Sequence, residues 1–339
     1  MKKIQYPQNT YKPPVKDKYV LGVETTCDET SLALVKDGHQ VISEITLSQA
    51  KQHEAYGGVV PELAGRNHLE NLQKIAPIFM QEIRQYPIDA VAVSFKVGLP
   101  PAVKVGETFA LGLSKALNVP LLKINHVIAH IWGVWVDAKI EHKPQFPLLG
   151  VIISGGHTML VDFRSPTNYK IIGQTVDDAI GEVFDKVARV LDLGYPGGPY
   201  IEKWAREGDE LAYHLPHSAK TKGLDMSFSG LKTATIQTYR KELERYKKTF
   251  PMYEHYLKAD IAASFQAAAF SQLIDKIEQA VEKTGYKTIV LGGGVSANNR
   301  LIDMLWQKVG EKAPYIYAPS LKYCGDNAAF IAGYGINFL

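Results

Sequence analysis

The sequence has few cysteines, no long apolar run and little net charge. These features bear in turn on disulfide-stabilised folds, membrane proteins and nucleic-acid binding. Its 339 residues include only Cys27 and Cys324, too few for a disulfide framework and typical of a reducing compartment. No apolar run approaches the roughly 20 residues that span a bilayer, so we expect no membrane segment. Residues 1–18 lack the apolar core of a signal peptide and predict a flexible extension of a cytoplasmic protein. The net charge of +3 neither demands nor excludes a nucleic-acid partner.

The chain contains 46% hydrophobic residues and is long enough for two domains. Residues 19–46 and 148–174 share one pattern of strand, polar turn, second strand and third strand, which indicates an internal duplication. The polar, proline-containing residues 137–147 form the candidate boundary. Further along, the patterns predict helices at 61–84, around 105–117, 175–191, 261–284 and from 327 onward, a turn at 98–101, and a polar insertion at 208–256.

Two histidines, His126 and His130, follow an apolar run that predicts a buried strand. Their four-residue spacing places both imidazoles on one face of a helix, at the sheet edge where α/β proteins bind ligands. A metal ion can bridge such a pair. For an isolated pair, one core histidine and one exposed histidine would be the more common outcome, so the interpretation depends on other motifs.

A metal would need a third ligand, and Asp326 is the best-placed carboxylate, at the junction of a loop and a predicted helix. The alternative role for Asp326 is to cap that helix. Two histidines and a carboxylate leave coordination positions open, a ligand set that favours Fe²⁺ and also accommodates Zn²⁺.

Glycine-rich turns follow several strands, at residues 98–106, 154–158, 194–199 and 292–298. Glycine lets backbone amides approach phosphate oxygens closely, although each turn alone is more often an ordinary tight turn. None matches a Walker loop or the ordered dinucleotide fingerprint, so the pattern indicates a different nucleotide-binding architecture.

Two clusters of charged residues each have two interpretations, either a binding site or a solvent-exposed surface. Asp178, Glu182 and Asp185 share a face of the helix predicted at 175–191, with Asp177 beside them, and one of these carboxylates could bind a ribose. The insertion could bind RNA or could be a solvated helix. Its basic and aromatic residues are Lys220, Lys222, Lys232, Arg240, Lys241, Arg245, Lys247 and Lys248, with Tyr239, Tyr246 and Phe250.

From about residue 20 to the end, these motifs in their order resemble the TsaD family of tRNA threonylcarbamoyladenosine transferases. The matching segments are residues 24–30, 53–68, 125–130, 154–158, 177–186, 195–199, 228–234, 293–298 and 324–328. The resemblance implies an α/β fold of the actin-like, sugar-kinase-like class, with two ribonuclease-H-like lobes and a central ligand cleft. The implied lobes are residues 19–140, on which the helix at 327–339 packs, and residues 148–326 with the insertion at 208–256.

The resemblance also implies a reaction, in which a threonylcarbamoyl group passes from threonylcarbamoyl-AMP to N6 of the adenosine 3′ of the anticodon. The recipient tRNAs read codons that begin with A. His126, His130 and Asp326 match the family's metal ligands, for which we expect one divalent ion, Fe²⁺ ahead of Zn²⁺ or Mg²⁺. The positions that match those holding the adenylate are Ile152, Ile153, Ser154, Gly155, Gly156, Asp185, Gly198 and Asn298. The implied partners are tRNA, a TsaB-like paralogue and a TsaE-like ATPase.

The amine of adenosine must lose a proton as it attacks, and we hypothesise that Asp28 or Glu29 accepts that proton. One loop departs from the family, because Lys96, Val97 and Gly98 stand where Gly-Pro-Gly is common. Two other enzyme classes compete with the transferase. A zinc protease of the His-Glu-x-x-His type would need glutamate where Val127 stands, and a small-molecule kinase of the same fold would not be expected to need the histidine pair.

Overall fold

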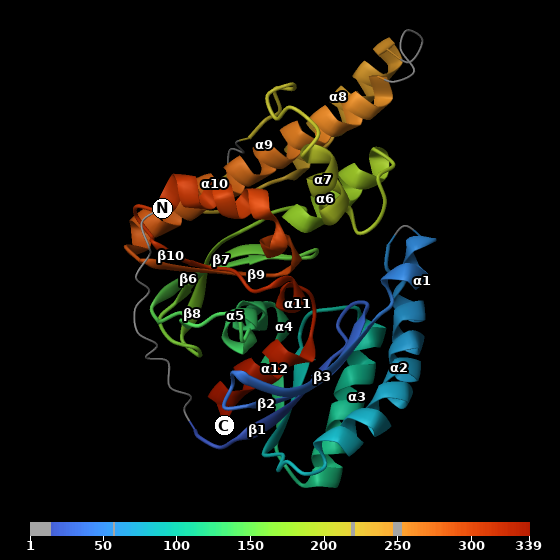
Figure 1. The fold of residues 1–339 in the computed structure, drawn as a ribbon, viewed down its shortest axis with the longest axis vertical. Helices are drawn as coiled ribbons and strands as arrows, with labels where there is room; N and C mark the ends of the chain where they lie inside the picture. Colours follow the sequence, from blue (N-terminus) through green and yellow to red (C-terminus); the bar gives the residue numbers. More distant parts are fainter. Residues whose placement is uncertain (1–14, 57, 218–220, 247–252) are drawn as a thin grey trace.

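The computed structural model describes residues 15–56, 58–217, 221–246 and 253–339, and it contains two five-stranded sheets (Figure 1). The first sheet has the order β3-β2-β1-β4-β5, with strands β1 (Tyr19–Glu24), β2 (Glu29–Lys36), β3 (Gln40–Ser48), β4 (Ala90–Phe95) and β5 (Leu121–Asn125). The second has the order β10-β9-β6-β7-β8, with strands β6 (Leu148–Ile153), β7 (Thr158–Phe163), β8 (Tyr169–Gln174), β9 (Thr288–Gly292) and β10 (Tyr315–Tyr317).

The two sheets repeat one topology. In each, the first three strands form an antiparallel meander and the last two strands pair in parallel, on the other side of the first strand. Each also carries a register shift between its second and third strands, at Leu34/Val35 and at Leu160/Val161. The predicted internal duplication is therefore confirmed at the level of topology.

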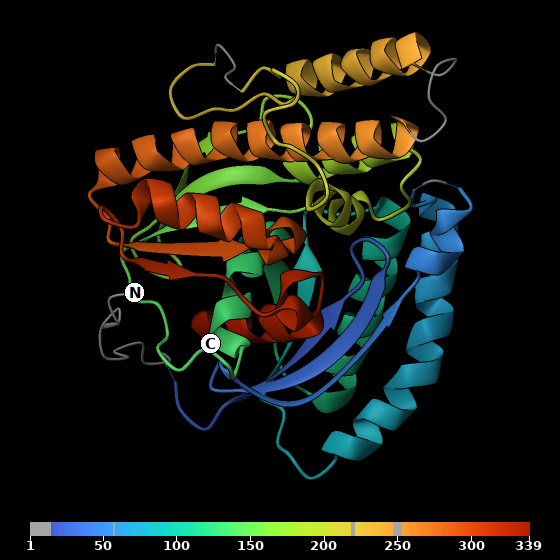
Figure 2. The same ribbon diagram turned by 45° about the horizontal axis from the view of Figure 1, so that its top comes forward.

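The helices form layers outside and between the sheets (Figures 1 and 2). Those of the first half are α1 (Ala50–Glu54), α2 (Pro61–Ile83), α3 (Pro100–Leu117), α4 (His126–Ala129), the 3-10 turn η1 (His130–Trp132) and α5 (Gly133–Val136). Those of the second half are α6 (Ile180–Val190), α7 (Gly197–Ala205), α8 (Ser229–Tyr246), α9 (Tyr253–Thr284), η2 (Gly294–Ala297), α10 (Asn299–Val309), α11 (Leu321–Cys324), α12 (Ala328–Gly335) and η3 (Ile336–Phe338).

Alternating strand residues separate three hydrophobic cores. In β1, Leu21 and Val23 face α2 and α3, while Val20 faces a core between the two sheets. In β6, Leu149 and Val151 face α6 and α9, while Ile152 faces the same central core. Both faces of each sheet are thus covered, which explains why these strands are apolar along almost their whole length.

The central core contains two crossing segments. The segment formed by α4, η1 and α5 lies against the second sheet, although it follows the last strand of the first. Helix α12 follows the last strand of the second sheet and lies against the first. Glycines permit both approaches: a Cβ at Gly22 in β1 would lie 2.2 Å from the Ala328 carbonyl oxygen, and one at Gly292 would lie 2.7 Å from the His130 carbonyl carbon.

Several element boundaries differ from the predictions. Helix α3 begins at Pro100, not near residue 105, because prolines occupy its first turn, where their missing N–H groups cost nothing. Pro100 and Pro101, predicted to end a turn, are therefore helical. The insertion at 208–256 contains α8 and the start of α9. Helix α9 begins at Tyr253 and not at residue 261, because its first two turns are polar and lack the apolar periodicity of a helix.

The other predictions about chain organisation have mixed outcomes. Residues 1–14 of the predicted flexible extension lie outside the described residues, whereas Lys18 is anchored by an ion pair with Asp89 at 2.7 Å. The lobe limits of 19–140 and 148–326 stay a prediction. None of the helices in the described part of the chain is both long and apolar enough to cross a bilayer.

The close contact at Gly22 gives a stability prediction. Gly22→Ala would push α12 away from β1, and we expect it to lower the free energy of unfolding by about 2–3 kcal/mol, as overpacked cores do. Gly112→Ala is the matched control, because a Cβ there meets nothing within 4 Å, and helix propensity predicts a gain of about 0.5–1 kcal/mol. Urea unfolding measures both, and equal stability of the two variants would contradict the assigned contact.

Candidate active site

The two histidines lie where β5 enters the central core. The Asn125 side chain caps α4 by accepting hydrogen bonds from the Val127 and Ile128 amides at 3.1 and 3.3 Å. His126 begins α4, and His130 begins the 3-10 turn that follows it. The prediction of one regular helix was wrong, because α4 ends after four residues. Its i and i+4 imidazoles still lie together, with ring centroids 4.7 Å apart.

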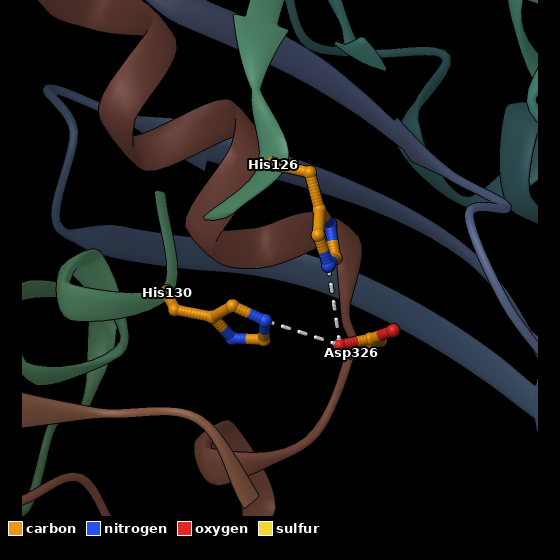
Figure 3. Close-up of side chains that lie close together, drawn as sticks. All are labelled: His126, His130 and Asp326. Atoms are coloured by element: carbon orange, nitrogen blue, oxygen red, sulfur yellow. Dashed lines mark ion pairs between the residues drawn. The ribbon is translucent and has the colours of Figure 1, made fainter. Parts of the chain in front are cut away.

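Asp326 completes the cluster from the other crossing segment. The alternative role for Asp326, capping α12, belongs to its neighbour Asn327, whose side chain accepts a hydrogen bond from the Phe330 amide at 3.1 Å. The Asp326 Oδ1 atom lies 3.5 Å from Nε2 of His126 and 3.4 Å from Nε2 of His130 (Figure 3). One ligand atom from each of the three residues lies within 4.8 Å of the others, which suits a shared metal ion.

A buried carboxylate that sequence reasoning missed orients this cluster. Glu24, at the end of β1, accepts a hydrogen bond from Nδ1 of His126 at 2.8 Å and another from the Thr26 amide at 2.6 Å. Since the Nδ1 atom carries the proton, Nε2 is free to bind a metal on the side of Asp326. An acidic residue ending an otherwise apolar buried strand was the available signal for this role.

The electrostatics of the cluster fit a cation. Burial lowers the pKa of His126, but the Glu24 and Asp326 carboxylates outweigh it and raise that pKa well above its ordinary value. Burial and the neighbouring charge of His126 lower the pKa of His130 to about 3. Burial would raise the pKa of Asp326, but the imidazoles hold it well below its usual range. Two carboxylates thus favour positive charge here, and the neutral His130 is ready to act as a ligand.

The two candidate bases share a cleft of about 420 Å³ with the three candidate ligands. Asp28 lies in the turn between β1 and β2, Glu29 begins β2, and both residues line this cleft. Burial raises the pKa of Glu29 to about 9, and the charges of Asp28 and Asp326 add to the rise. Glu29 is therefore protonated at neutral pH, while the structure brings both acids to the predicted metal site.

The loop that departs from the family pattern lines the same cleft. Val97, Gly98 and Leu99 lie on its wall, and the Leu99 amide donates a hydrogen bond to the Thr26 carbonyl at 2.8 Å. Gly98 has a φ of +125°, and a Cβ there would lie 2.5 Å from the Thr26 carbonyl oxygen. The retained glycine thus permits the loop's close approach to Thr26.

The glycine turn after β6 also lines the cleft. A Cβ at Gly155 or at Gly156 would meet nothing within 4 Å, so their backbone is open to a ligand. Ser154 closes the turn through its amide, which donates to the His157 carbonyl at 2.8 Å. Ile152 and Ile153 point their side chains into the cores on opposite faces of the sheet, so only their backbone could contact a substrate.

The remaining candidate substrate-binding residues lie in a second chamber that continues the cleft. Gly198 and Asn298 line this chamber, while Gly155, Asp185 and Gly294 line both chambers. The Asp185 carboxylate accepts a hydrogen bond from the Gly197 amide at 2.6 Å, and burial raises the pKa of this carboxyl group. Asn298 caps α10 through its side-chain oxygen, which accepts from the Leu301 amide at 3.2 Å.

The predicted acidic helix face is not formed as expected. Helix α6 begins at Ile180, so Asp177 and Asp178 precede it. Asp177 instead accepts a hydrogen bond from the Phe228 amide at 2.9 Å, and Asp178 forms ion pairs with Lys186 and Lys232. The prediction failed because the acidic residues before the helix happen to continue its i, i+4 spacing. Of these acids, only Asp185 lines the cleft.

The insertion offers fewer RNA-binding groups than predicted. Tyr239 is only 5% exposed and packs in the core below α8, so its ring is not available to stack on bases. Lys232 is paired with Asp178, whereas Lys222, Arg240 and Lys241 are exposed. Lys220, Lys247, Lys248, Phe250 and the side chain of Tyr246 lie outside the described residues.

Comparison with known proteins identifies the family. The family model described as TsaD, tRNA N6-adenosine threonylcarbamoyltransferase, matches residues 40–333. The chain belongs to this family. The relative from Caldicellulosiruptor saccharolyticus that bears the same enzyme name is 42% identical over 318 residues, which cover 93% of this chain and 91% of the relative. The relative from Protochlamydia amoebophila is 44% identical over 322 residues, covering 93% and 91%. The predicted family and enzyme class are confirmed, and nothing favours the kinase or protease alternatives.

Solved structures show the fold. Full-length HypF in its phosphate- and nucleotide-bound form aligns with a TM-score of 0.61 at 15% identity, covering 98% of this chain and 47% of that chain. Component A of the (R)-2-hydroxyglutaryl-CoA dehydratase of Acidaminococcus fermentans aligns with a TM-score of 0.52 at 13% identity, covering 95% and 98%. The predicted actin-like, sugar-kinase-like α/β fold is confirmed.

The contact between Glu24 and His126 gives a prediction for metal affinity. Glu24→Gln removes the charge that orients and polarises His126, so we expect Zn²⁺ and Fe²⁺ to bind about 10- to 100-fold more weakly. Titration calorimetry on metal-free protein measures the change, with the exposed Glu62→Gln as control. Unchanged affinity would remove Glu24 from the site.

The raised pKa of Glu29 gives a prediction for stability. In metal-free protein, folded Glu29 keeps its proton until about pH 9, whereas the unfolded chain releases it near the ordinary value of 4.5. The folded state binds the extra proton between these values, so wild-type stability falls as pH rises through this window. Glu29→Gln lacks this proton, and its melting temperature relative to wild type should rise from about pH 5 to about pH 8. A constant difference would mean that Glu29 is ionised in the fold.

Proposed function

We propose that this chain transfers the threonylcarbamoyl group of threonylcarbamoyl-AMP to N6 of the adenosine 3′ of the anticodon, in tRNAs that read codons beginning with A. AMP is released. The observation that carries the proposal is the two-chambered cleft, with His126, His130 and Asp326 in the first chamber and glycine turns lining both chambers. Such a cleft suits a ligand with an activated acyl group on one side and a nucleotide on the other, and family membership supports this substrate.

The nucleotide part of the substrate fits the turns around Gly155 and Gly294. A Cβ at either position would meet nothing within 4 Å, so a phosphate can approach the backbone amides there. Asp185 lies beside both turns and could accept hydrogen bonds from a ribose hydroxyl. Gly198 and Asn298 form the far wall of the second chamber.

His126, His130 and Asp326 would hold one divalent ion, which we propose to be Fe²⁺, with Zn²⁺ and Mg²⁺ as alternatives. Their donor set fits such an ion, because Nε2 of both imidazoles lies within 3.5 Å of one Asp326 oxygen. When bound, the ion supplies a Lewis acid that can polarise a carbonyl group. Glu24 keeps His126 in the tautomer that can serve as a ligand.

Asp28 is the proposed proton acceptor. In the reaction, N6 of adenosine forms a bond to the carbamoyl carbon, the bond from that carbon to the phosphate oxygen of AMP breaks, and N6 loses a proton. Glu29 already carries a proton at neutral pH, so it cannot accept another, and its pKa of about 9 suits it to donate a hydrogen bond to Asp28. Both acids lie in the cleft with the candidate ligands.

Partner proteins and cellular location extend the proposal. The resemblance implies a TsaB-like paralogue and a TsaE-like ATPase, and a tRNA substrate supports a cytoplasmic location. The transfer assay is therefore performed with purified protein, threonylcarbamoyl-AMP and unmodified tRNA, with and without these partners. Detection of threonylcarbamoyladenosine in the digested tRNA supports the proposal, and its absence under both conditions contradicts it.

Isosteric amide substitutions distinguish the roles of Asp28 and Glu29. Asp28→Asn should lower the transfer rate by about 10²- to 10⁴-fold, the usual contribution of a general base. Glu29→Gln should retain most of the rate, because an amide can donate the hydrogen bond of a neutral carboxyl group. Single-turnover assays measure the transfer rates of both variants, which are loaded to the same metal content. A slower rate for Glu29→Gln than for Asp28→Asn would assign the base to Glu29.

The metal ligands are tested by removal. His126→Ala should lose the bound ion and lower transfer about 100-fold or more, since the remaining two ligands hold a cation weakly. The exposed His39→Ala is the control and should match wild type in both properties. Elemental analysis gives the metal content, and wild-type transfer by metal-free His126→Ala protein would contradict the assignment.

A further inference from the structure

A buried histidine outside the metal cluster holds the acid turn, which we define as residues 27–30. His68 of α2 is 0% exposed. Its Nε2 atom lies 3.0 Å from the Cys27 carbonyl oxygen, and its Nδ1 atom lies 2.8 Å from the Thr30 hydroxyl oxygen. One imidazole thus contacts both ends of the turn that carries Asp28 and Glu29.

These contacts fix the tautomer of His68. A carbonyl oxygen only accepts hydrogen bonds, so Nε2 of His68 must donate to Cys27. Burial lowers the pKa of His68, so the ring is neutral and Nδ1 accepts a hydrogen bond from the Thr30 hydroxyl. The Thr30 oxygen in turn accepts from the Asn71 side-chain amide at 3.2 Å. The His68 Nε2–H, the Thr30 hydroxyl and the Asn71 amide thus each donate to an acceptor in this network.

Other described hydrogen bonds also reach this region, and one of them is made by a side chain. The Ser48 hydroxyl donates to the Glu29 carboxyl group at 3.1 Å. The Gln49 amide donates to the Asp28 carbonyl at 2.9 Å, and the Leu99 amide donates to the Thr26 carbonyl at 2.8 Å. The side chain of His68 spans the acid turn from Cys27 to Thr30. Because its two nitrogens bind opposite ends of the turn, a shift of the ring would move both carboxylates.

We propose that His68 is a positioning residue that holds the acid turn so that Asp28 and Glu29 face the cleft. The inference rests on the proposed function, because it assigns His68 a role in delivering the proton acceptor to the reacting amine. His68 itself lines neither chamber of the cleft, and its described hydrogen bonds reach Cys27 and Thr30. Its loss should therefore impair the chemical step and leave the binding of metal and of threonylcarbamoyl-AMP unchanged.

The kinetic test uses three substitutions of His68. His68→Leu removes both hydrogen bonds and should lower kcat about 100-fold, the effect of misplacing a catalytic group by about 1 Å, with KM for threonylcarbamoyl-AMP and metal content unchanged. His68→Gln can retain the donor to Cys27, and His68→Asn can retain the acceptor for Thr30. Each should recover part of the lost kcat, because each restores one end of the clamp.

A second readout does not depend on activity. Cys27 lies in the acid turn at the cleft, whereas the other cysteine, Cys324, is buried and 1% exposed. Burial raises the pKa of the Cys27 thiol, so in the wild type it should react slowly with a thiol reagent. Releasing the turn in His68→Leu should increase labelling of Cys27 about tenfold, located by peptide mass mapping.

The matched control is Phe79→Leu, which removes buried volume from the same helix without touching the acid turn. It should lower thermal stability without changing kcat or the labelling of Cys27. If His68→Leu behaves like Phe79→Leu in both readouts, His68 is only a core residue and the inference is wrong. If the wild type itself transfers nothing while the labelling still rises in His68→Leu, the positioning role stands and the proposed function fails.

Discussion

The crossing of two chain segments between the sheets is the constraint on which the site depends. The segment that follows β5 lies against the second sheet, and α12, which follows β10, lies against the first. Both contacts are so close that a methyl group at Gly22 or at Gly292 would collide with backbone atoms. Because each crossing segment is held by the opposite sheet, His126 and Asp326 meet at a fixed position although 200 residues of chain separate them. Their meeting place is the edge where the strands end, which is open to the cleft.

The duplication explains the division of chemistry within this cleft. The turn after β1 carries Asp28 and leads into Glu29 at the start of β2, and the topologically equivalent turn after β6 carries Gly155 and Gly156. One turn thus offers carboxylates and the other offers open backbone. The candidate metal ligands also come from equivalent places, after the last strand of each sheet. A shared fold with HypF at 15% identity does not specify this chemistry, since it depends on which side chains occupy the equivalent turns.

The burial of charge in this region is balanced by specific partners. Glu24 is fully buried, and its two described hydrogen bonds come from the His126 imidazole and the Thr26 amide. Asp326 has both imidazoles beside it. Glu29 has less compensation and keeps its proton instead, which is the usual response of a buried carboxyl group next to like charges. The metal cluster and the acid turn therefore respond differently to burial, because the candidate ligands are stabilised by opposite charges whereas Glu29 stays neutral.

The sequence alone determined the strands, the duplication and the family, because strand hydrophobicity, glycine turns and ordered motifs are local signals. It also pointed to His126, His130 and Asp326 through spacing and residue type. Only the tertiary structure decided which polar groups act together. Asn327 took the capping role that Asp326 could have filled, and Tyr239 proved to be a core residue. The partners of Glu24 and His68 come from segments 102 and 41 residues away, and such contacts exist only once the sheets and helices have packed.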